Sequence, residues 1–304
     1  MTIEFTIDGK KARGSEGETV LDVAKANDID IPTLCHHEAV ANWGGCRLCI
    51  VEIAQPEWNG QTKIVTSCLF KIKSGLTVTT NSARVAKNRE TILNLLLAQA
   101  PNAKEVKELA KKYGVTPMKL IHNDAKHRCI TCGLCTRLCA AQDAYAIATV
   151  HRGPEKAIGA FWQKPPESCI GCLICASNCP TQAIGFKEKK GSRHIWKKDF
   201  KLAKCSSCDS FLPLTEEQVK HYALRSSLGD KYFTVCEDCR RKETTNKFLD
   251  IIHDPAGEIM EKWNAEGLPP LKMPSPTKKW LEEEKRRMAT KQSRSPRSPM
   301  ARSR

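Results

Sequence analysis

Alternation of apolar and polar positions marks the start of the chain. Residues 3–7 alternate in the way of a half-buried strand, and Gly9-Lys10 indicates a turn into a return strand. Thr19 is placed to cap a helix over residues 20–26. Two further strands are predicted at 50–53 and 76–79. Together these elements predict a small α+β domain over residues 1–82.

The strongest helical periodicity lies at residues 84–100, where Pro101 ends the pattern. A second helix is predicted over 103–113 and another near 216–226. We therefore expect an α+β, multidomain protein. Its predicted parts are the first domain at 1–82, a helical linker at 83–122, an internal repeat at 123–190, a small four-cysteine module at 195–253 and a disordered basic tail at 268–304.

Composition excludes one large apolar core. The 304 residues are 40% hydrophobic and only 6% aromatic, with a mean hydropathy of −0.43. The best apolar stretch, residues 92–98, is short and interrupted by Asn94, so no membrane insertion is expected. The first ten residues lack the basic-then-apolar build of a signal peptide, which predicts a cytoplasmic location.

The net charge of +15 is concentrated at the C-terminal end. Residues 272–304 hold eleven Lys or Arg against three Glu, and prolines interrupt the segment before a low-complexity terminus. This tail lacks the interleaved aromatic residues of nucleic-acid platforms. The basic charge therefore says little about a folded nucleic-acid-binding face.

Cysteine placement changes the picture most. The sixteen cysteines fall into four groups of four with none left over. Cytoplasmic thiols stay reduced, and four ligands suit a tetrahedral ion or a cubane cluster. Inert buried thiols are the alternative, but they do not usually recur at a fixed C-x2-C spacing. The sequence therefore predicts four metal sites.

The first group joins one close pair to two distant cysteines, Cys35, Cys46, Cys49 and Cys68. Gly44 and Gly45 precede Cys46, and glycine lets backbone approach the sulfides of a [2Fe–2S] cluster closely. Zinc is the alternative, although an ordinary zinc site uses two close pairs. His36 and His37 adjoin Cys35, but the paired C-x-H loops of a Rieske centre are absent, so both are expected beside the cluster or at the surface.

The second and third groups are an internal repeat at an interval of 40 residues. Each half reads C-x2-C-x2-C-x3-C, and in the bacterial two-cluster ferredoxin the fourth cysteine serves the other cluster. The repeat therefore predicts two [4Fe–4S] clusters with crossed ligands. The first would be held by Cys129, Cys132, Cys135 and Cys179, and the second by Cys169, Cys172, Cys175 and Cys139.

The fourth group consists of two C-x2-C knuckles, Cys205, Cys208, Cys236 and Cys239, which is the usual layout of a zinc ribbon. Rubredoxin-like iron and a further iron–sulfur cluster are the alternatives. Rubredoxin knuckles usually continue with glycine, whereas Asp209 and Arg240 stand there, which favours zinc. The thin apolar core of this module would gain stability from the metal.

The first group and its surroundings resemble the N-terminal part of the large iron–sulfur subunit of NADH dehydrogenase and the diaphorase iron–sulfur subunit of NAD-linked hydrogenases. The resemblance runs through NWGGCRLCIVEI, TSCLFKIKSGLTVTTNS and the helix RETILNLLLAQAP. It implies a β-grasp [2Fe–2S] ferredoxin domain followed by linker helices and a two-cluster ferredoxin domain. One departure is clear: the family commonly has a His-x3-Cys-x2-Cys-x5-Cys cluster after the helix, whereas PNAKEVKELAKKYGV has neither residue type.

No dinucleotide, phosphate-loop, metalloprotease or nucleophile-elbow motif is present, so the sequence shows no substrate site of its own. The resemblance implies an iron–sulfur electron-transfer subunit of an NAD(P)H-linked oxidoreductase. Its partners would be a flavin- and NAD(P)H-binding subunit and a catalytic redox subunit, such as a hydrogenase or formate dehydrogenase. The alternatives are a nucleic-acid or protein-binding scaffold with structural clusters and a zinc ribbon, and a stand-alone reductase.

Overall fold

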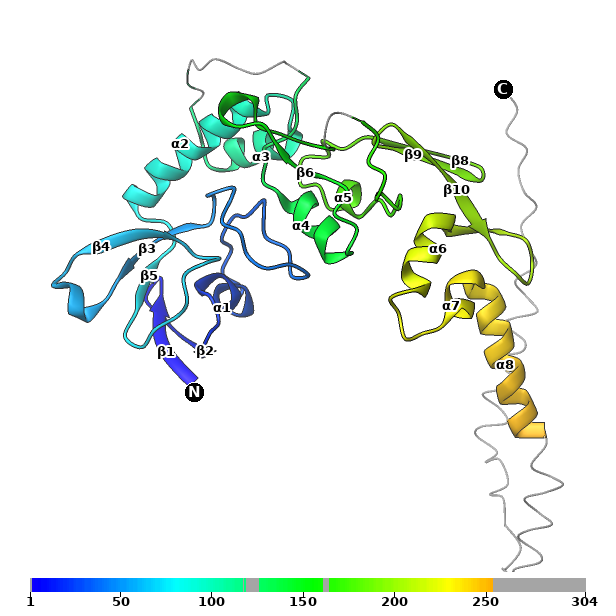
Figure 1. The fold of residues 1–304 in the computed structure, drawn as a ribbon. Coiled ribbons are helices and arrows are strands. Elements are labelled where there is room, and N and C mark those ends of the chain that lie inside the picture. Colours follow the sequence, from blue (N-terminus) through cyan, green and yellow to red (C-terminus); the bar gives the residue numbers. More distant parts are fainter. Residues whose placement is uncertain (1, 117, 119–125, 161–163, 254–304) are drawn as a thin grey trace, which may run out of the picture. The chain divides into compact units, whose positions relative to one another are not determined.

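The structure is a computed structural model that describes the chain except residues 1, 117, 119–125, 161–163 and 254–304 (Figure 1). The chain divides into two compact units, residues 1–239 and 240–304, and all sixteen cysteines lie in the first. The predicted basic tail at 268–304 lies outside the described residues. No helix among the described residues is both long enough and apolar enough to cross a bilayer.

A five-stranded sheet organises the N-terminal part in the order β2-β1-β5-β3-β4 (Figure 1). Strand β1 pairs in parallel with β5, and the other neighbours are antiparallel. The prediction of a small α+β fold is confirmed, and the sheet adds β4, which the sequence pattern did not indicate. The strands are β1 (Thr2–Ile7), β2 (Lys10–Ser15), β3 (Ile50–Ala54), β4 (Thr62–Thr66) and β5 (Thr77–Thr79).

Helix α1 (Val20–Ala26) packs its apolar side on this sheet. Thr19 is the N-cap as predicted: its side chain accepts from the Asp22 N–H, and the Asp22 carboxylate accepts from the Thr19 N–H. This reciprocal pair satisfies two N–H groups that a helix start leaves without partners. The shared core joins α1 to Phe5, Ile53 and other strand residues.

Helices α2 (Ala83–Gln99) and α3 (Lys104–Lys112) follow the sheet and confirm the two predicted helices within a residue or two. Their apolar side contributes Leu93, Leu96 and Val106 to a second core. Two polar residues of α2, Arg89 and Asn94, are buried as well. This core also contains cysteines from the first and second groups, so the linker helices form part of the wall of the candidate sites.

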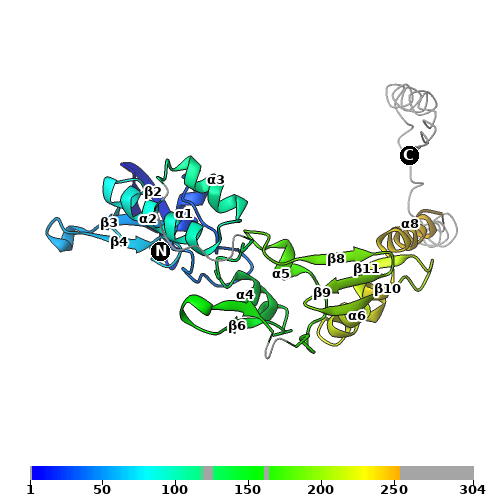
Figure 2. The same cartoon turned by 90° about the horizontal axis from the view of Figure 1, so that it is seen from above.

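The repeat forms helices α4 (Leu134–Ala141) and α5 (Ile174–Ser177), which pack against each other. The insert between the halves contains the hairpin β6 (Ala148–Val150) and β7 (Ala157–Gly159). A four-stranded sheet, in the order β11-β10-β9-β8, then runs continuously from the end of the repeat past the first knuckle (Figure 2). Its strands are β8 (Phe186–Lys189), β9 (Ser192–Ile195), β10 (Lys198–Lys204) and β11 (Phe211–Thr215).

Helix α6 (Glu216–Ala223) packs against β10 and β11 and confirms the helix predicted near Glu216. Thr215 caps α6 by a second reciprocal pair, with Gln218. The knuckles are joined through α6 and α7 (Asp230–Thr234), and α8 (Glu237–His253) begins at the second knuckle. The two short helices η1 (Pro56–Trp58) and η2 (Gly153–Glu155) complete the described elements.

Candidate iron–sulfur and metal sites

The four cysteines of the first group gather as two close pairs in the interior. All four are buried, with exposed fractions of 3% or less. The Cys46 N–H donates to Cys35 Sγ at 3.4 Å, and the Sγ atoms of Cys49 and Cys68 lie 3.3 Å apart. Each iron of a [2Fe–2S] cluster held by four cysteines takes two thiolates. Two pairs of thiols therefore form a donor set that fits this group.

Contacts within each pair shift the acidity of the thiols. The hydrogen bond with Cys46 lowers the pKa of Cys35 to about 5 and raises the pKa of Cys46. The contact with Cys68 lowers the pKa of Cys49 to about 7 and raises that of Cys68. One thiol of each pair is therefore more acidic than its partner, and the thiolate is the form that binds iron.

Glycine is required where the loop of the first group passes its neighbours. Gly44 has φ +66°, and a Cβ there would lie 2.6 Å from the Cδ1 atom of Leu69. A Cβ on Gly45 would lie 2.6 Å from the ring of Trp43 and 3.2 Å from the carbonyl oxygen of Cys132. The predicted need for bare backbone before Cys46 is thus explained by close packing, including packing against the internal repeat.

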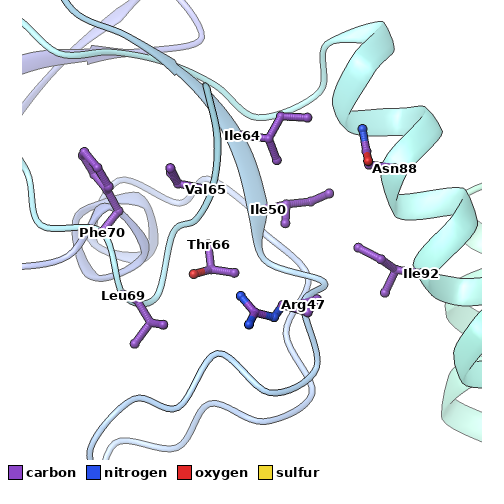
Figure 3. Close-up of a pocket in the computed structure, with 9 residues that line it drawn as sticks. All are labelled: Arg47, Ile50, Ile64, Val65, Thr66, Leu69, Phe70, Asn88 and Ile92. Atoms are coloured by element: carbon purple, nitrogen blue, oxygen red, sulfur yellow. The ribbon is translucent and has the colours of Figure 1, made fainter. Parts of the chain in front are cut away.

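A shallow cavity of about 480 Å³ flanks the same loop (Figure 3). Its lining is mainly apolar, with Ile50 and Ile64 from the sheet and Ile92 from α2. Arg47, which stands between Cys46 and Cys49, is exposed at its rim with φ +59°. No sequence pattern indicated this cavity, because its walls come from elements far apart in the chain.

The cysteines of the repeat line two further cavities, and each cavity draws on both halves of the repeat. One is lined by Cys129, Cys132, Cys135 and Cys179. The other is lined by Cys139, Cys169, Cys172 and Cys175. The structure therefore brings together the same two sets that the crossed-ligand pattern predicts. Four thiols around a cavity walled by apolar side chains are a donor set that fits a [4Fe–4S] cluster.

Backbone conformation is repeated between the two sets. Thr131 and Gly171 occupy equivalent positions, and both have positive φ. Gly133 and Leu173, also equivalent, are the left-handed N-caps of α4 and α5. Both halves therefore wind the loop in the same sense before turning into a short helix that carries the fourth cysteine toward the other set.

Burial is the main influence on the acidity of the thiols in the repeat, whereas hydrogen bonds between paired thiols are the main influence in the first group. Desolvation raises the pKa of Cys132 to about 11 and the pKa values of Cys135 and Cys175 to about 12. Without a cation such thiols stay protonated, whereas coordination to a metal deprotonates a thiol outright. The fourth cysteines already accept backbone donors, since the Ala146 and Ala183 N–H groups donate to the sulfurs of Cys139 and Cys179 at 3.2 and 3.3 Å.

Direct contacts join the first group to the repeat. Arg137 lies on α4 between the last two cysteines of its motif and donates to the carbonyl oxygens of Cys35 and Ala41, both at 2.6 Å. Cys35 and Cys46 share one apolar core with Ile130 and Cys132. Arg137 was not singled out from the sequence. Its position between Cys135 and Cys139, a positive charge inside a cysteine motif, was the feature that could have indicated its role.

The two histidines beside Cys35 make hydrogen bonds with asparagine. His36 Nδ1 lies 2.7 Å from Asn42 Oδ1, and His37 Nε2 lies 3.1 Å from Asn178 Oδ1. Asn178 directly precedes Cys179 of the repeat. His37 therefore adds another link between the first group and the repeat.

The fourth group is gathered around a single point. The sulfurs of Cys205, Cys208, Cys236 and Cys239 all lie within 4.8 Å of one another, the one such group of His, Cys, Asp or Glu side chains found among the described residues. A tetrahedral ion with metal–sulfur bonds of about 2.3 Å separates its ligands by about 3.8 Å. The spacing therefore fits one ion, and the chemistry of four thiolates suits zinc or iron.

Backbone donors organise these knuckles. The N–H groups of Cys236 and Ser207 donate to Cys205 Sγ at 3.2 and 3.4 Å, and they lower the pKa of Cys205 to about 6. The Cys239 N–H donates to Cys236 Sγ at 3.4 Å. Asp209 follows the first knuckle with φ +55°, a conformation that glycine would adopt at less cost.

Comparison with known proteins identifies two domain families. Residues 1–83 match the 2Fe-2S iron-sulfur cluster binding domain, and residues 168–212 match the 4Fe-4S dicluster domain. The second match covers the motif at 169–179 and continues past the first knuckle, whereas the motif at 129–139 lies before it.

Several curated relatives are similar over about three fifths of the chain. The HndD subunit of NADP-reducing hydrogenase from Solidesulfovibrio fructosivorans is 32% identical, covering 64% of this chain and 37% of the relative. A subunit of the NADH-quinone oxidoreductase of Rhizobium meliloti is 28% identical, covering 60% and 24%. The alpha subunit of NADPH-Fe(3+) oxidoreductase from Geobacter sulfurreducens is 30% identical, covering 64% and 25%.

The chain therefore spans less than two fifths of the length of these relatives. A crystal structure of NAD+-reducing [NiFe]-hydrogenase in the H2-reduced state shares 30% identity over 52% of this chain and 75% of that chain, with a TM-score of 0.46. The domain matches and the relatives confirm the resemblance that the sequence motifs predicted. The chain carries a 2Fe-2S iron-sulfur cluster binding domain and a 4Fe-4S dicluster domain, and it is a homologue of subunits of NADP-reducing hydrogenase and NADH-quinone oxidoreductase.

Proposed function

We propose that this chain is the electron-transfer subunit of an NAD(P)H-linked oxidoreductase complex. In this proposal the first group of cysteines holds one [2Fe–2S] cluster, and the two crossed sets of the repeat hold one [4Fe–4S] cluster each. The fourth group holds one zinc ion, with iron as the alternative. When bound, the three clusters accept and release single electrons, and the zinc is structural.

The observation that carries the proposal is the direct packing of the first group on the first set of the repeat. Cys46 and Cys132 belong to one apolar core, and Gly45 brings the loop of the first group against the Cys132 carbonyl. Arg137 fixes the same contact by binding the carbonyl oxygen of Cys35. Electron transfer between centres needs short separations, and a purely structural cluster domain would need no such contact.

The residues of the chain have three tasks in this function. The cysteines hold the clusters, apolar residues such as Leu48 and Leu93 exclude water, and backbone N–H groups directed at sulfur adjust the potentials. Because the set around Cys132 touches the first group and both sets of the repeat meet at α4 and α5, we infer one continuous path. It runs from the first group to the set around Cys132 and on to the set around Cys172.

We infer that one partner binds flavin and NAD(P)H and delivers single electrons, and that another is a catalytic redox subunit that takes one electron for each electron received. The names of the relatives support this division, since they are subunits of hydrogenases and NADH or NADPH oxidoreductases. We infer that the shallow cavity beside Arg47 is where the flavin-binding partner docks, since it lies close to the first group (Figure 3). We infer a cytoplasmic location, where thiols stay reduced until they bind metal.

Metal analysis with electron paramagnetic resonance (EPR) on anaerobically purified protein tests this function. We expect roughly ten iron and about one zinc per chain, from one two-iron cluster, two four-iron clusters and one ribbon site. Cys46→Ser should abolish the two-iron signal and leave the four-iron signals. Cys208→Ser is the matched control, because it should lower zinc and leave all three iron signals.

An iron content near four, or the lack of a two-iron signal in the parent protein, would contradict the proposal. Reduction of a dye by the isolated chain with NAD(P)H would instead indicate a stand-alone reductase. A band shift with DNA or RNA that weakens steeply with salt would favour the scaffold alternative.

A further inference from the structure

The hairpin formed by β9 and β10 lies against the ligand loop that carries Cys169 and Cys172. Both strands follow the second cysteine motif and lead into the first knuckle (Figure 2). Three of its side chains reach toward the loop, and the function proposed above uses none of them. They are Arg193, Trp196 and Lys198.

Arg193 ties the loop to the elements behind it. Its side chain is 5% exposed, and Nη1 donates to the carbonyl oxygen of Gly171 at 2.8 Å. The same guanidinium donates to the Pro213 carbonyl at 3.0 Å and to Gln218 Oε1 at 3.1 Å. Its charge is balanced by Glu188 at 3.1 Å. Arg193 therefore acts mainly as a brace that holds the loop in place.

Lys198 brings a positive charge to the same loop. Its Nζ donates to the carbonyl oxygen of Cys169 at 3.0 Å and to that of Glu167 at 2.9 Å. Within the described part of the chain, no carboxylate forms an ion pair with Lys198. Its charge is therefore free to act on the sulfur of Cys169 and on a group bound there.

Trp196 lies between the two sets of the repeat. Its side chain lines both cysteine-lined cavities. The indole Nε1 is buried and completes no hydrogen bond of ordinary geometry with any described residue. Trp196 and Cys175 line the same cavity. A buried N–H without a partner costs free energy unless a bound group accepts from it.

The backbone at Trp196 gives independent support. Ile195 pairs with Lys198, so Trp196 and Lys197 form a two-residue hairpin turn, and both have positive φ, +53° and +60°. Such turns strongly prefer Asn-Gly, and a bulky residue with positive φ is strained. A strained tryptophan directed at a cysteine set indicates that the side chain serves the site.

The equivalent position of the other set has a neutral contact. There Gln99 Nε2 donates to the hydroxyl of Thr131, the counterpart of Gly171. The side-chain donor at Thr131 is therefore neutral, whereas the donor at Gly171 is the guanidinium of Arg193.

We propose that Lys198 and Trp196 raise the reduction potential of the cluster held by Cys139, Cys169, Cys172 and Cys175, so that electrons settle there, at the end of the path. This rests on the proposed function. A cation near the cluster and a buried N–H beside it that can donate to it both stabilise the reduced form, which carries one more negative charge. Both are positioning residues: they act on the cluster through its ligands and through charge.

An anaerobic redox titration followed by EPR, with the full-length protein, tests this inference. The signal of this cluster is identified by its change in Cys172→Ser. Lys198→Met and Trp196→Phe should each raise the oxidised-to-reduced ratio of this cluster about threefold at fixed potential. This corresponds to a reduction potential that is lower by about 28 mV. The double variant should give about tenfold, or 59 mV. The [2Fe–2S] cluster of the first group, whose cysteines lie outside both cavities, should keep its potential.

Lys201→Met is the matched control, because Lys201 is an exposed residue of the same strand and loses the same charge. Lys198→Arg should restore most of the potential. Equal shifts of the reduction potential in Lys198→Met and Lys201→Met would overturn the inference. An unchanged potential in Lys198→Met, or in Trp196→Phe, would overturn it as well. Both outcomes would leave the proposed function intact. Absence of four-iron signals from the parent protein would refute the proposed function itself.

Discussion

Replacement of Arg89 by methionine should loosen the first cysteine group selectively. Arg89 is a buried residue of α2 whose guanidinium donates to three carbonyl oxygens. These belong to Leu48 and Ile50, on either side of Cys49, and to Thr80, at 3.3, 3.0 and 3.3 Å. Methionine preserves most of the volume and length, so the main loss is the three hydrogen bonds.

The magnitude follows from those three acceptors. A buried acceptor left without its donor costs about 1–3 kcal/mol, and relief of burying the guanidinium charge offsets part of the sum. Burial also lowers the pKa of Arg89, which is the sign of that desolvation cost. If the free energy of local opening around the first group falls by about 3 kcal/mol, the population of the locally opened form rises roughly 100-fold.

Release of iron to a chelator, followed by decay of the two-iron EPR signal under anaerobic conditions, measures that opened population. We expect Arg89→Met to release this iron roughly 100-fold faster than the parent protein. Arg84→Met is the control on the same helix, since Arg84 is exposed and its ion pair with Glu52 at 3.4 Å is worth at most about 1 kcal/mol. Equal release rates in the two variants would refute the reasoning.

Three other outcomes follow from the second set and the knuckles. Gly171→Ala should lower the free energy of unfolding by about 2–5 kcal/mol, because φ is +70° and the new Cβ would lie 2.8 Å from the Phe200 ring. Gly153→Ala is the control: Gly153 also has positive φ but lies in open space, so the loss should be about 1–2 kcal/mol. The thermal loss of visible absorbance compares the two variants, and equal losses would contradict the steric argument. Thr215→Val should hasten loss of iron from the second set by leaving the Ile170 carbonyl, now bonded at 2.6 Å, without its donor; an unchanged rate would count against that link. Removing metal from the fourth group with Cys208→Ser should lower the protection of β10, β11 and α6 against hydrogen exchange, and unchanged protection would argue against a structural metal.

Local signals in the sequence were sufficient for the N-terminal elements other than β4. Thr19 with Asp22 three residues later marks the start of α1, and the periodicity of residues 84–100 gives α2. The cysteine sets predicted from spacing for the repeat and the knuckles also lie together in the structure, where each set lines one cavity or surrounds one point. Spacing is informative here because a metal ligand set constrains residue type and separation together.

The second sheet escaped prediction for physical reasons. All four residues of β8 are exposed, so no alternation marks it, and Pro213 within β11 argues against a strand. Strand β10 does bury Phe200 and Leu202 in alternation, and that signal was available. Arg89 and Trp196 act through contacts with residues far away in the sequence. Local sequence shows only a polar residue in a helix and an aromatic residue in a turn, so these contacts could not be predicted from it.

In the proposed function each cluster of the repeat takes thiols from both halves, and this sharing has a consequence for biogenesis. A nascent chain that has emerged only as far as the first motif offers three thiols for one cube and a single thiol for the other, so neither can be filled. Both become complete within a few residues of each other, once Cys175 and Cys179 leave the ribosome. Delivery of the two cubes is therefore a late and joint event, and a gene cut between the motifs would yield a product that can carry neither.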